Sequence, residues 1–92
     1  MKVRYSSVAL RQLDEIFDYI SQDNLEAAHR VKSHIVNSIH ALSQFPLLGR
    51  PTDKENVRVL SITRYPYITI YQTTEAEVIV IRIRHAARKP EE

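Results

Sequence analysis

The side chains best suited to chemistry lie in the last third of the chain, where arginine and histidine are interleaved with isoleucine and valine. His85 stands three residues after Arg82 and three before Arg88. A histidine beside arginines can act as a general acid or base on a phosphodiester, with the arginines stabilising the charge that develops. Alternatively, His85 only closes the end of a strand or forms a hydrogen bond in a partner interface. The spacing by itself favours this second, non-catalytic hypothesis.

The positive charge is concentrated in residues 57–90. That segment holds six basic residues against two acidic ones, a charge of +4, whereas the whole chain carries +2 with histidine neutral. This total is too small to predict nucleic-acid binding by itself. Five of the six basic side chains are arginines, whose planar fork suits carboxylates and phosphates, although an ordinary solvated strand face is the alternative. The basic residues are Arg58, Arg64, Arg82, Arg84, Arg88 and Lys89.

Other combinations of reactive side chains cannot be recognised. There is no cysteine, which excludes a thiolate metal site, and there is no Ser-His-Asp set or phosphate-binding glycine loop. His29, His34 and His40 fall on a predicted helix at spacings that place no two of them on one face. No acidic residue completes a metal set with them. We therefore expect surface histidines, no metal and no cofactor.

A small sheet and two helices must position these side chains. Residues 2–5 alternate as a short strand, and two amphipathic helices follow as a hairpin whose apolar stripes must be buried. After Pro46 the chain predicts a loop. Three strands follow at residues 57–61, 67–72 and 77–84, and their short connections make them antiparallel. The stripes are Leu10, Leu13, Ile16, Phe17 and Ile20, then Ala28, Val31, Ile35, Ile39 and Leu42.

The predicted fold class is α+β: an N-terminal strand, a two-helix hairpin and a three-stranded antiparallel meander, with the helices packed on one sheet face. We assign the isoleucine faces of the last two strands to the helices; these comprise Ile68, Ile70, Ile79, Ile81 and Ile83. The opposite face would then carry tyrosines and arginines and form a recognition surface. The predicted partner-binding residues are Arg50, Arg58, Arg64, Tyr65, Arg82, Arg84, His85 and Arg88.

Gly49 is the only glycine in the chain. A left-handed backbone conformation is the first explanation for it, and close backbone packing is the second. The neighbouring Arg50 could reach a partner from the loop or pair with an acidic residue that pins the loop. Tyr65 and Tyr67 flank Pro66 at the rim of the sheet, and one of them is expected to pack in the core.

Length and composition predict a single domain over residues 1–92. A hydrophobic content of 43% is enough for a modest core. No apolar run is long enough to span a membrane, and the N-terminus lacks the apolar stretch of a signal peptide. Small secreted domains usually carry disulfides, so the absence of cysteine favours a cytoplasmic protein.

The order of these motifs resembles the ParE/RelE toxin superfamily of bacterial toxin–antitoxin modules, over about residues 2–90. The resemblance rests on the Phe-Pro-Leu-Leu-Gly-Arg-Pro loop, the Tyr-Pro-Tyr-Ile-Thr-Ile-Tyr strand and the Val-Ile-Arg-Ile-Arg-His-Ala-Ala-Arg-Lys-Pro ending. The ending, with His85 and Arg88 just after an isoleucine-rich strand, is its most specific part. The branches of the superfamily share one fold, so the fold alone does not decide the function.

RelE-like members cut messenger RNA in the ribosomal A site, whereas ParE-like members inhibit DNA gyrase and are associated with plasmid stabilisation. The RelE-like pattern implies basic residues on the sheet and often a tyrosine near the C-terminus. Here residues 67–72 contain no basic residue, and Lys-Pro-Glu-Glu follows Arg88. The resemblance therefore favours a gyrase inhibitor without catalytic residues over a ribosome-dependent endoribonuclease or a non-toxic binding module. In the nuclease alternative the catalytic residues would be Arg58, Arg82, His85 and Arg88.

The resemblance also implies a cognate antitoxin whose C-terminal segment wraps over the toxin. An acidic, amphipathic segment would suit a basic strand face by charge complementarity and by strand addition at a sheet edge. The expected partners are this antitoxin and DNA gyrase, or the ribosome and messenger RNA under the alternative. Operator DNA would be reached only through the antitoxin, and no membrane is expected to take part.

Overall fold

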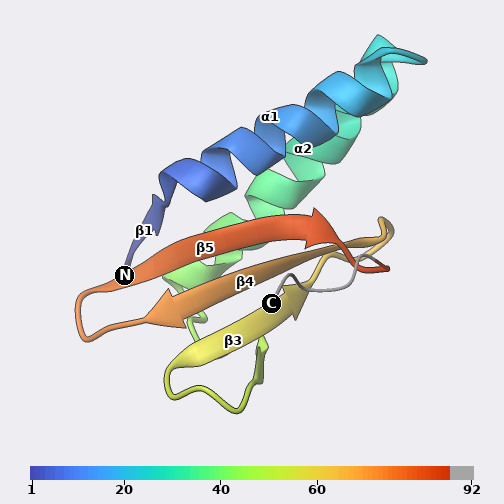
Figure 1. The fold of residues 1–92 in the computed structure, drawn as a ribbon. Helices are drawn as coiled ribbons and strands as arrows, with labels where there is room; N and C mark the ends of the chain where they lie inside the picture. Colours follow the sequence, from blue (N-terminus) through green and yellow to red (C-terminus); the bar gives the residue numbers. More distant parts are fainter. Residues whose placement is uncertain (88–92) are drawn as a thin grey trace.

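The computed structural model describes residues 1–87, in which two helices pack on one face of a mixed five-stranded sheet (Figure 1). The sheet order is β1-β5-β4-β3-β2, with β1 parallel to β5 and every other pair antiparallel. The predicted α+β fold is confirmed, and the sheet gains a two-residue edge strand, β2. The elements are β1 Lys2–Tyr5, α1 Ser7–Ser21, α2 Leu25–His40, the 3₁₀ turn η1 Ala41–Ser43, β2 Arg50–Pro51, β3 Val57–Ser61, β4 Tyr67–Thr73 and β5 Glu77–His85.

Each helix begins at a side chain that accepts a hydrogen bond from the first turn. The Ala9 amide donates to Ser6 Oγ over 3.0 Å, and the Ala27 amide donates to Asn24 Oδ1 over 3.0 Å. These caps satisfy amides that have no partner inside the helix.

The core lies between the helical hairpin and the inner face of the sheet. Ala9, Ile35 and Ile39 are fully buried there, as are Val78 and Val80 of β5. Burying each large aliphatic side chain contributes about 1.5–3 kcal/mol. Within residues 1–87 no helix combines the length and apolar character that crossing a membrane requires.

The assignment of the isoleucine faces to the helices is confirmed for Ile83, which is buried in the core cluster, and is wrong for Ile70 and Ile79. Tyr71 and Val80 are fully buried in the core, whereas Ile70 and Ile79 are only half-buried and lie outside the core cluster. Tyr71 pairs with Val80, and their side chains lie on one face, toward the helices. The tyrosines of β4 therefore face inward, and its isoleucines face outward.

A β-bulge explains why β5 does not keep a single alternating face. Val80 and Ile83 are three residues apart, yet both are buried in the core. The pairing passes from Tyr71↔Val80 to Ile70↔Arg82, which leaves Ile81 as the extra residue. Such an insertion changes which alternate residues of the strand face the core. A strict two-residue alternation could not predict this switch.

Close backbone packing, and not a left-handed backbone conformation, explains the glycine at position 49. Its φ is not positive, so no left-handed conformation requires glycine. A Cβ at this position would lie 2.8 Å from the Tyr71 hydroxyl and 2.8 Å from the Val59 carbonyl oxygen. Glycine is needed because the loop backbone approaches the sheet too closely for any side chain.

Candidate functional site

The outer face of the sheet, which the helices leave uncovered, combines an apolar centre with a basic margin. Arg84 pairs with Ile68, and Arg82 pairs with Ile70, so both arginines share the outward face of these isoleucines. Arg50 joins the margin from the edge strand, where its Nη1 lies 3.4 Å from Ser61 Oγ. We define the outer face as Val57, Val59, Ser61, Ile68, Ile70, Gln72, Ile79, Arg82 and Arg84. Of the predicted arginines, Arg82 and Arg84 are therefore on the uncovered face and Arg50 is at its margin, whereas the tyrosines of β4 are not on this face.

Arg58 has a structural environment that separates it from the other arginines. It pairs with Tyr71 and so shares the inner-face orientation of that residue. Its Nη1 donates to the Gly49 carbonyl over 2.8 Å and to the Leu47 carbonyl over 3.4 Å. The guanidinium thus holds the loop against β3. The loop is pinned by Arg58 through backbone carbonyls, whereas Arg50 contacts Ser61 rather than an acidic residue.

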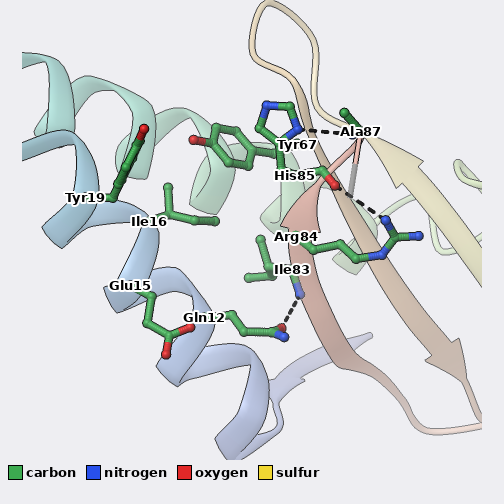
Figure 2. Close-up of a pocket in the computed structure, with 9 residues that line it drawn as sticks. All are labelled: Gln12, Glu15, Ile16, Tyr19, Tyr67, Ile83, Arg84, His85 and Ala87. Atoms are coloured by element: carbon green, nitrogen blue, oxygen red, sulfur yellow. Dashed lines mark hydrogen bonds between the residues drawn. The ribbon is translucent and has the colours of Figure 1, made fainter. Parts of the chain in front are cut away.

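A cleft of about 580 Å³ lies between α1 and the end of β5, and we call it the β5 cleft (Figure 2). Ile16 and Ile83 give it an apolar floor, and Glu15 contributes a carboxylate. Tyr67 and His85 lie side by side at its upper end. Its lining residues are Gln12, Glu15, Ile16, Tyr19, Tyr67, Ile83, Arg84, His85 and Ala87.

His85 is held in place by two neighbours. Its ring centroid lies 5.5 Å from that of Tyr67 in an edge-to-face arrangement. Its Nδ1 accepts a hydrogen bond from the Ala87 amide over 3.0 Å. Because Nδ1 is an acceptor, the neutral ring carries its proton on Nε2. His85 therefore lies at the end of β5 with its Nδ1 occupied, which leaves Nε2 available to a partner.

Tyr67 remains a hydrogen-bond donor at neutral pH. Burial raises the pKa of its phenol above the ordinary value, and the nearby Tyr19 hydroxyl raises it further. Removing a phenolate from water disfavours the charged form. The β5 cleft consequently presents a protonated phenol, an imidazole Nε2 and a carboxylate above an apolar floor.

The residues of the nuclease alternative are distributed over both faces of the sheet. Arg58 pairs with Tyr71, whereas His85 pairs with Tyr67, which lies four residues earlier in β4. At about 3.3 Å per residue these positions are about 13 Å apart along the strand. Arg82 lies on the opposite face, and Arg88 lies outside the described residues. The described members do not converge on one reacting group.

Sequence patterns missed the contribution of α1 to the β5 cleft. Gln12, Glu15 and Tyr19 stand on successive turns of the helix, beside its buried stripe. This spacing of three and four residues was a usable signal for a second helical surface. What the pattern could not supply is the neighbour of that surface, because the end of β5 reaches α1 only in the folded chain.

Of the three histidines expected on the surface, His34 departs from expectation. Its Nε2 is buried without a hydrogen-bond partner, and its ring lies 5.3 Å from that of Tyr65.

Tyr65 and Tyr67 both pack against the core cluster, rather than only one of them. Within residues 1–87 no group of three or more histidine, aspartate or glutamate side chains is arranged to hold a metal ion.

The fold is that of the small α+β toxins found in bacterial toxin–antitoxin modules. The chain belongs to the family described as ParE toxin of the type II toxin–antitoxin system parDE, whose model matches residues 3–90. This places it within the ParE/RelE superfamily and confirms the resemblance found in the sequence.

Two relatives cover most of the chain. Y4kP of Sinorhizobium fredii, which is named as a candidate toxin, is 36% identical over 92% of this chain and 88% of its own. Toxin RelE2 of Caulobacter vibrioides is 35% identical over 87% of this chain and 89% of its own. The two relatives thus support the toxin family without separating its branches.

Solved structures show the same fold. A chain of the chromosomal ParDE toxin–antitoxin system from P. aeruginosa has a TM-score of 0.82 at 27% identity, covering 92% of this chain and 95% of that one. A chain of the RelBE2 complex from Mycobacterium tuberculosis has a TM-score of 0.68 at 22% identity, covering 91% and 95%. Both structures are of toxin–antitoxin systems, and the family to which this chain belongs is described as the toxin of such a system.

Proposed function

We propose that this toxin acts in the cytoplasm by binding and inhibiting DNA gyrase, without breaking any covalent bond. The observation that carries the proposal is the dispersal of Arg58, Arg82 and His85 over two faces of the sheet. A nuclease needs an acid or base and a charge stabiliser on the same phosphodiester. In addition, β4 from Tyr67 to Thr73 contains no basic residue that could supply the missing charge.

The outer face suits the antitoxin. Its apolar centre, including Ile70, Ile79 and Val59, would accept the apolar side of an amphipathic segment. Arg50 and Arg82 at its margin would pair with acidic side chains of that segment. Arg84 also lies at this margin of the outer face. Operator DNA would then be contacted by the antitoxin alone.

The β5 cleft suits the inhibited target. It offers an apolar floor at Ile16 and Ile83, and hydrogen-bonding groups at Tyr67 and His85. An apolar residue with a polar neighbour on a gyrase surface would fill it, as hot-spot residues fill pockets in other complexes. Here His85 Nε2 contributes a hydrogen bond and no proton transfer.

Purified gyrase and relaxed plasmid test the proposal directly. We expect the toxin to block supercoiling, and addition of the cognate antitoxin to restore it. In this assay His85→Ala should weaken inhibition by about tenfold, which corresponds to the loss of about 1.4 kcal/mol of binding. Lys54→Gln, a change at an exposed loop residue outside both surfaces, should inhibit as well as the unmodified toxin. Normal supercoiling at excess toxin would contradict the gyrase proposal.

Ribosome-dependent cleavage of messenger RNA is the second candidate, favoured by the 35% identity to a toxin named RelE2. In that case His85 Nε2 and the arginines would act on the phosphodiester, and His85→Ala would abolish activity rather than weaken it. Primer extension on messenger RNA from a translating extract distinguishes the two. Codon-associated cleavage that disappears with His85→Ala would establish the nuclease and displace the gyrase proposal.

A further inference from the structure

A second groove, of about 390 Å³, lies on the other side of the hairpin, between α2 and the β3–β4 turn, and neither proposed surface uses it. Arg30, Ser33 and Asn37 approach it from successive turns of α2, and Arg64 and Tyr65 approach it from the turn. Among residues 1–87, no acidic and no aliphatic side chain lines it. We call it the α2 groove. Its lining is cationic, hydrogen-bonding and aromatic.

Within residues 1–87 no ion pair involves the arginines of the α2 groove. The two ion pairs found there join Arg4 to Glu77 and Lys32 to Asp14, and neither involves Arg30 or Arg64. Arg58, for comparison, is occupied by two backbone carbonyls. Two arginines without such partners on one concavity create a positive potential that favours an anionic ligand.

Arg64 stands in a backbone conformation that arginine ordinarily avoids. Its φ is 79°, in the left-handed region where glycine is free of strain. A residue with a side chain loses roughly 1–2 kcal/mol there. Glycine would satisfy the turn better, so the turn geometry does not account for arginine. Strain at a residue that lines a groove points to a role for its side chain.

His34 supplies a further unsatisfied group next to Tyr65. Its Nε2 is buried and has no hydrogen-bond partner within residues 1–87. The Tyr65 ring packs on it at 5.3 Å with an interplanar angle of 74°, which orients the aromatic wall of the groove. A buried nitrogen without a partner is destabilising.

We propose that the α2 groove binds the phosphodiester backbone of a nucleic acid. Arg30 and Arg64 would donate charge-assisted hydrogen bonds to phosphate oxygens, and Ser33 and Asn37 would add neutral ones. The Tyr65 ring would stack on a base. An acidic protein segment is the competing ligand class. It is disfavoured because the groove has no aliphatic side chain to receive the apolar residues of such a segment.

The arginine in the strained turn permits a test that does not disturb folding. Arg64→Gly removes the guanidinium and relieves the backbone strain, so its melting temperature should equal or exceed that of the unmodified toxin. Asn56→Gly makes the same backbone change at the other positive-φ position, where φ is 63°, and lies outside the groove. Arg11→Gln removes one positive charge from an exposed site on α1.

Fluorescence polarisation with a labelled single-stranded 20-mer and with its duplex measures the binding. We expect the unmodified full-length toxin to bind at least one of them, and Arg64→Gly to weaken binding about tenfold and reduce the salt dependence by about one released counterion. Asn56→Gly and Arg11→Gln should bind like the unmodified toxin. Competition by inorganic phosphate but not by polyglutamate supports phosphate recognition.

Three results would overturn the proposal. The first is no binding to either nucleic acid. The second is an equal loss with Arg64→Gly and Arg11→Gln, which indicates general electrostatic attraction. The third is displacement by polyglutamate at the same charge concentration, which assigns the groove to an acidic protein. None of these results depends on gyrase inhibition, so this inference and the proposed function can fail separately.

Discussion

Tyr71 occupies a position at the centre of the inner sheet face where alternation predicts an aliphatic side chain. The ring is fully buried, yet its hydroxyl donates to the Pro46 carbonyl over 2.8 Å and accepts from the Gly49 amide over 2.9 Å. Both hydrogen bonds offset the cost of burying the phenol. The residue therefore fills the core and also fastens the loop that carries Arg50.

Removing only the Tyr71 hydroxyl tests this double role. In Tyr71→Phe the ring still fills the core, but the Gly49 amide and the Pro46 carbonyl lose their partner. We expect the free energy of unfolding to fall by about 1–3 kcal/mol, measured by urea denaturation. Tyr19→Phe makes the same change on a residue that is 73% exposed and should have no measurable effect. Equal stability of both variants would show that the hydroxyl contacts add nothing.

At this scale the sequence supports some inferences and not others. The helical stripes could be predicted, because a period of three and four residues follows from helix geometry alone. The inward turn of Tyr71 could not be predicted, because it depends on two backbone groups from a distant loop. For the same reason Arg58 and Arg82 looked equivalent in the sequence, although one holds a loop and the other lies on the outer face.

The β-bulge in β5 determines what the end of that strand offers to partners. Past the bulge, Ile83 faces the core and Arg82 and Arg84 face outward. The end of β5 extends beyond the residues that pair with β1. The backbone groups on this free edge therefore need other hydrogen-bond partners. Ser6 Oγ donates to the Ile81 carbonyl over 2.9 Å, and the Ile83 amide donates to Gln12 Oε1 over 2.7 Å. The start of α1 thus covers this edge of β5 and prevents it from pairing with a strand of another chain.

Gln12→Ala should expose this edge. Without the amide oxygen, the Ile83 N–H loses its acceptor, and we expect stability to fall by about 1 kcal/mol. Hydrogen exchange read by NMR should show faster exchange at the Ile83 amide than at amides of β3 and β4. Gln22→Ala, an exposed position just after α1, is the matched control. Unchanged protection at Ile83 would mean that the side chain of Gln12 does not protect the edge.

The positions of the strands could be predicted from the sequence, whereas the β-bulge in β5 and the approach of α1 to that strand could not. The predicted strands at 57–61, 67–72 and 77–84 differ from the observed ones by at most one residue at an end. Their alternation is local information. A bulge is set by the partner strand, and the β5 cleft is set by the approach of α1, so neither is encoded in any single segment.

Across the whole molecule, β1 and β5 are joined by parallel pairing and by an ion pair at the sheet margin. Arg4 Nε lies 3.1 Å from Glu77 Oε1, and a second hydrogen bond joins the same side chains. The hydrogen bond from Arg4 lowers the pKa of the Glu77 carboxyl below its ordinary value. A lowered pKa in the folded state means that the stabilisation is present above the ordinary value and is lost as the pH falls.

Comparing Glu77→Gln with the unmodified toxin at two pH values tests this contribution. At about pH 7 the variant should unfold at a slightly lower urea concentration, and at about pH 3 the difference should disappear. The control is Glu75→Gln, at an exposed hairpin residue, which should show no difference at either pH. A difference that persisted in acid would point to a cause other than the carboxylate charge.

The pairing of Lys2 with Glu77 also bears on how the toxin is made. The helical hairpin is local and can form early, but its apolar stripes have no sheet to cover them until the last strand is available. A ribosome that has not yet translated residues 77–85 therefore carries a chain without its core, its β5 cleft or its outer face. Neither proposed binding surface can therefore form before the strand block has been synthesised.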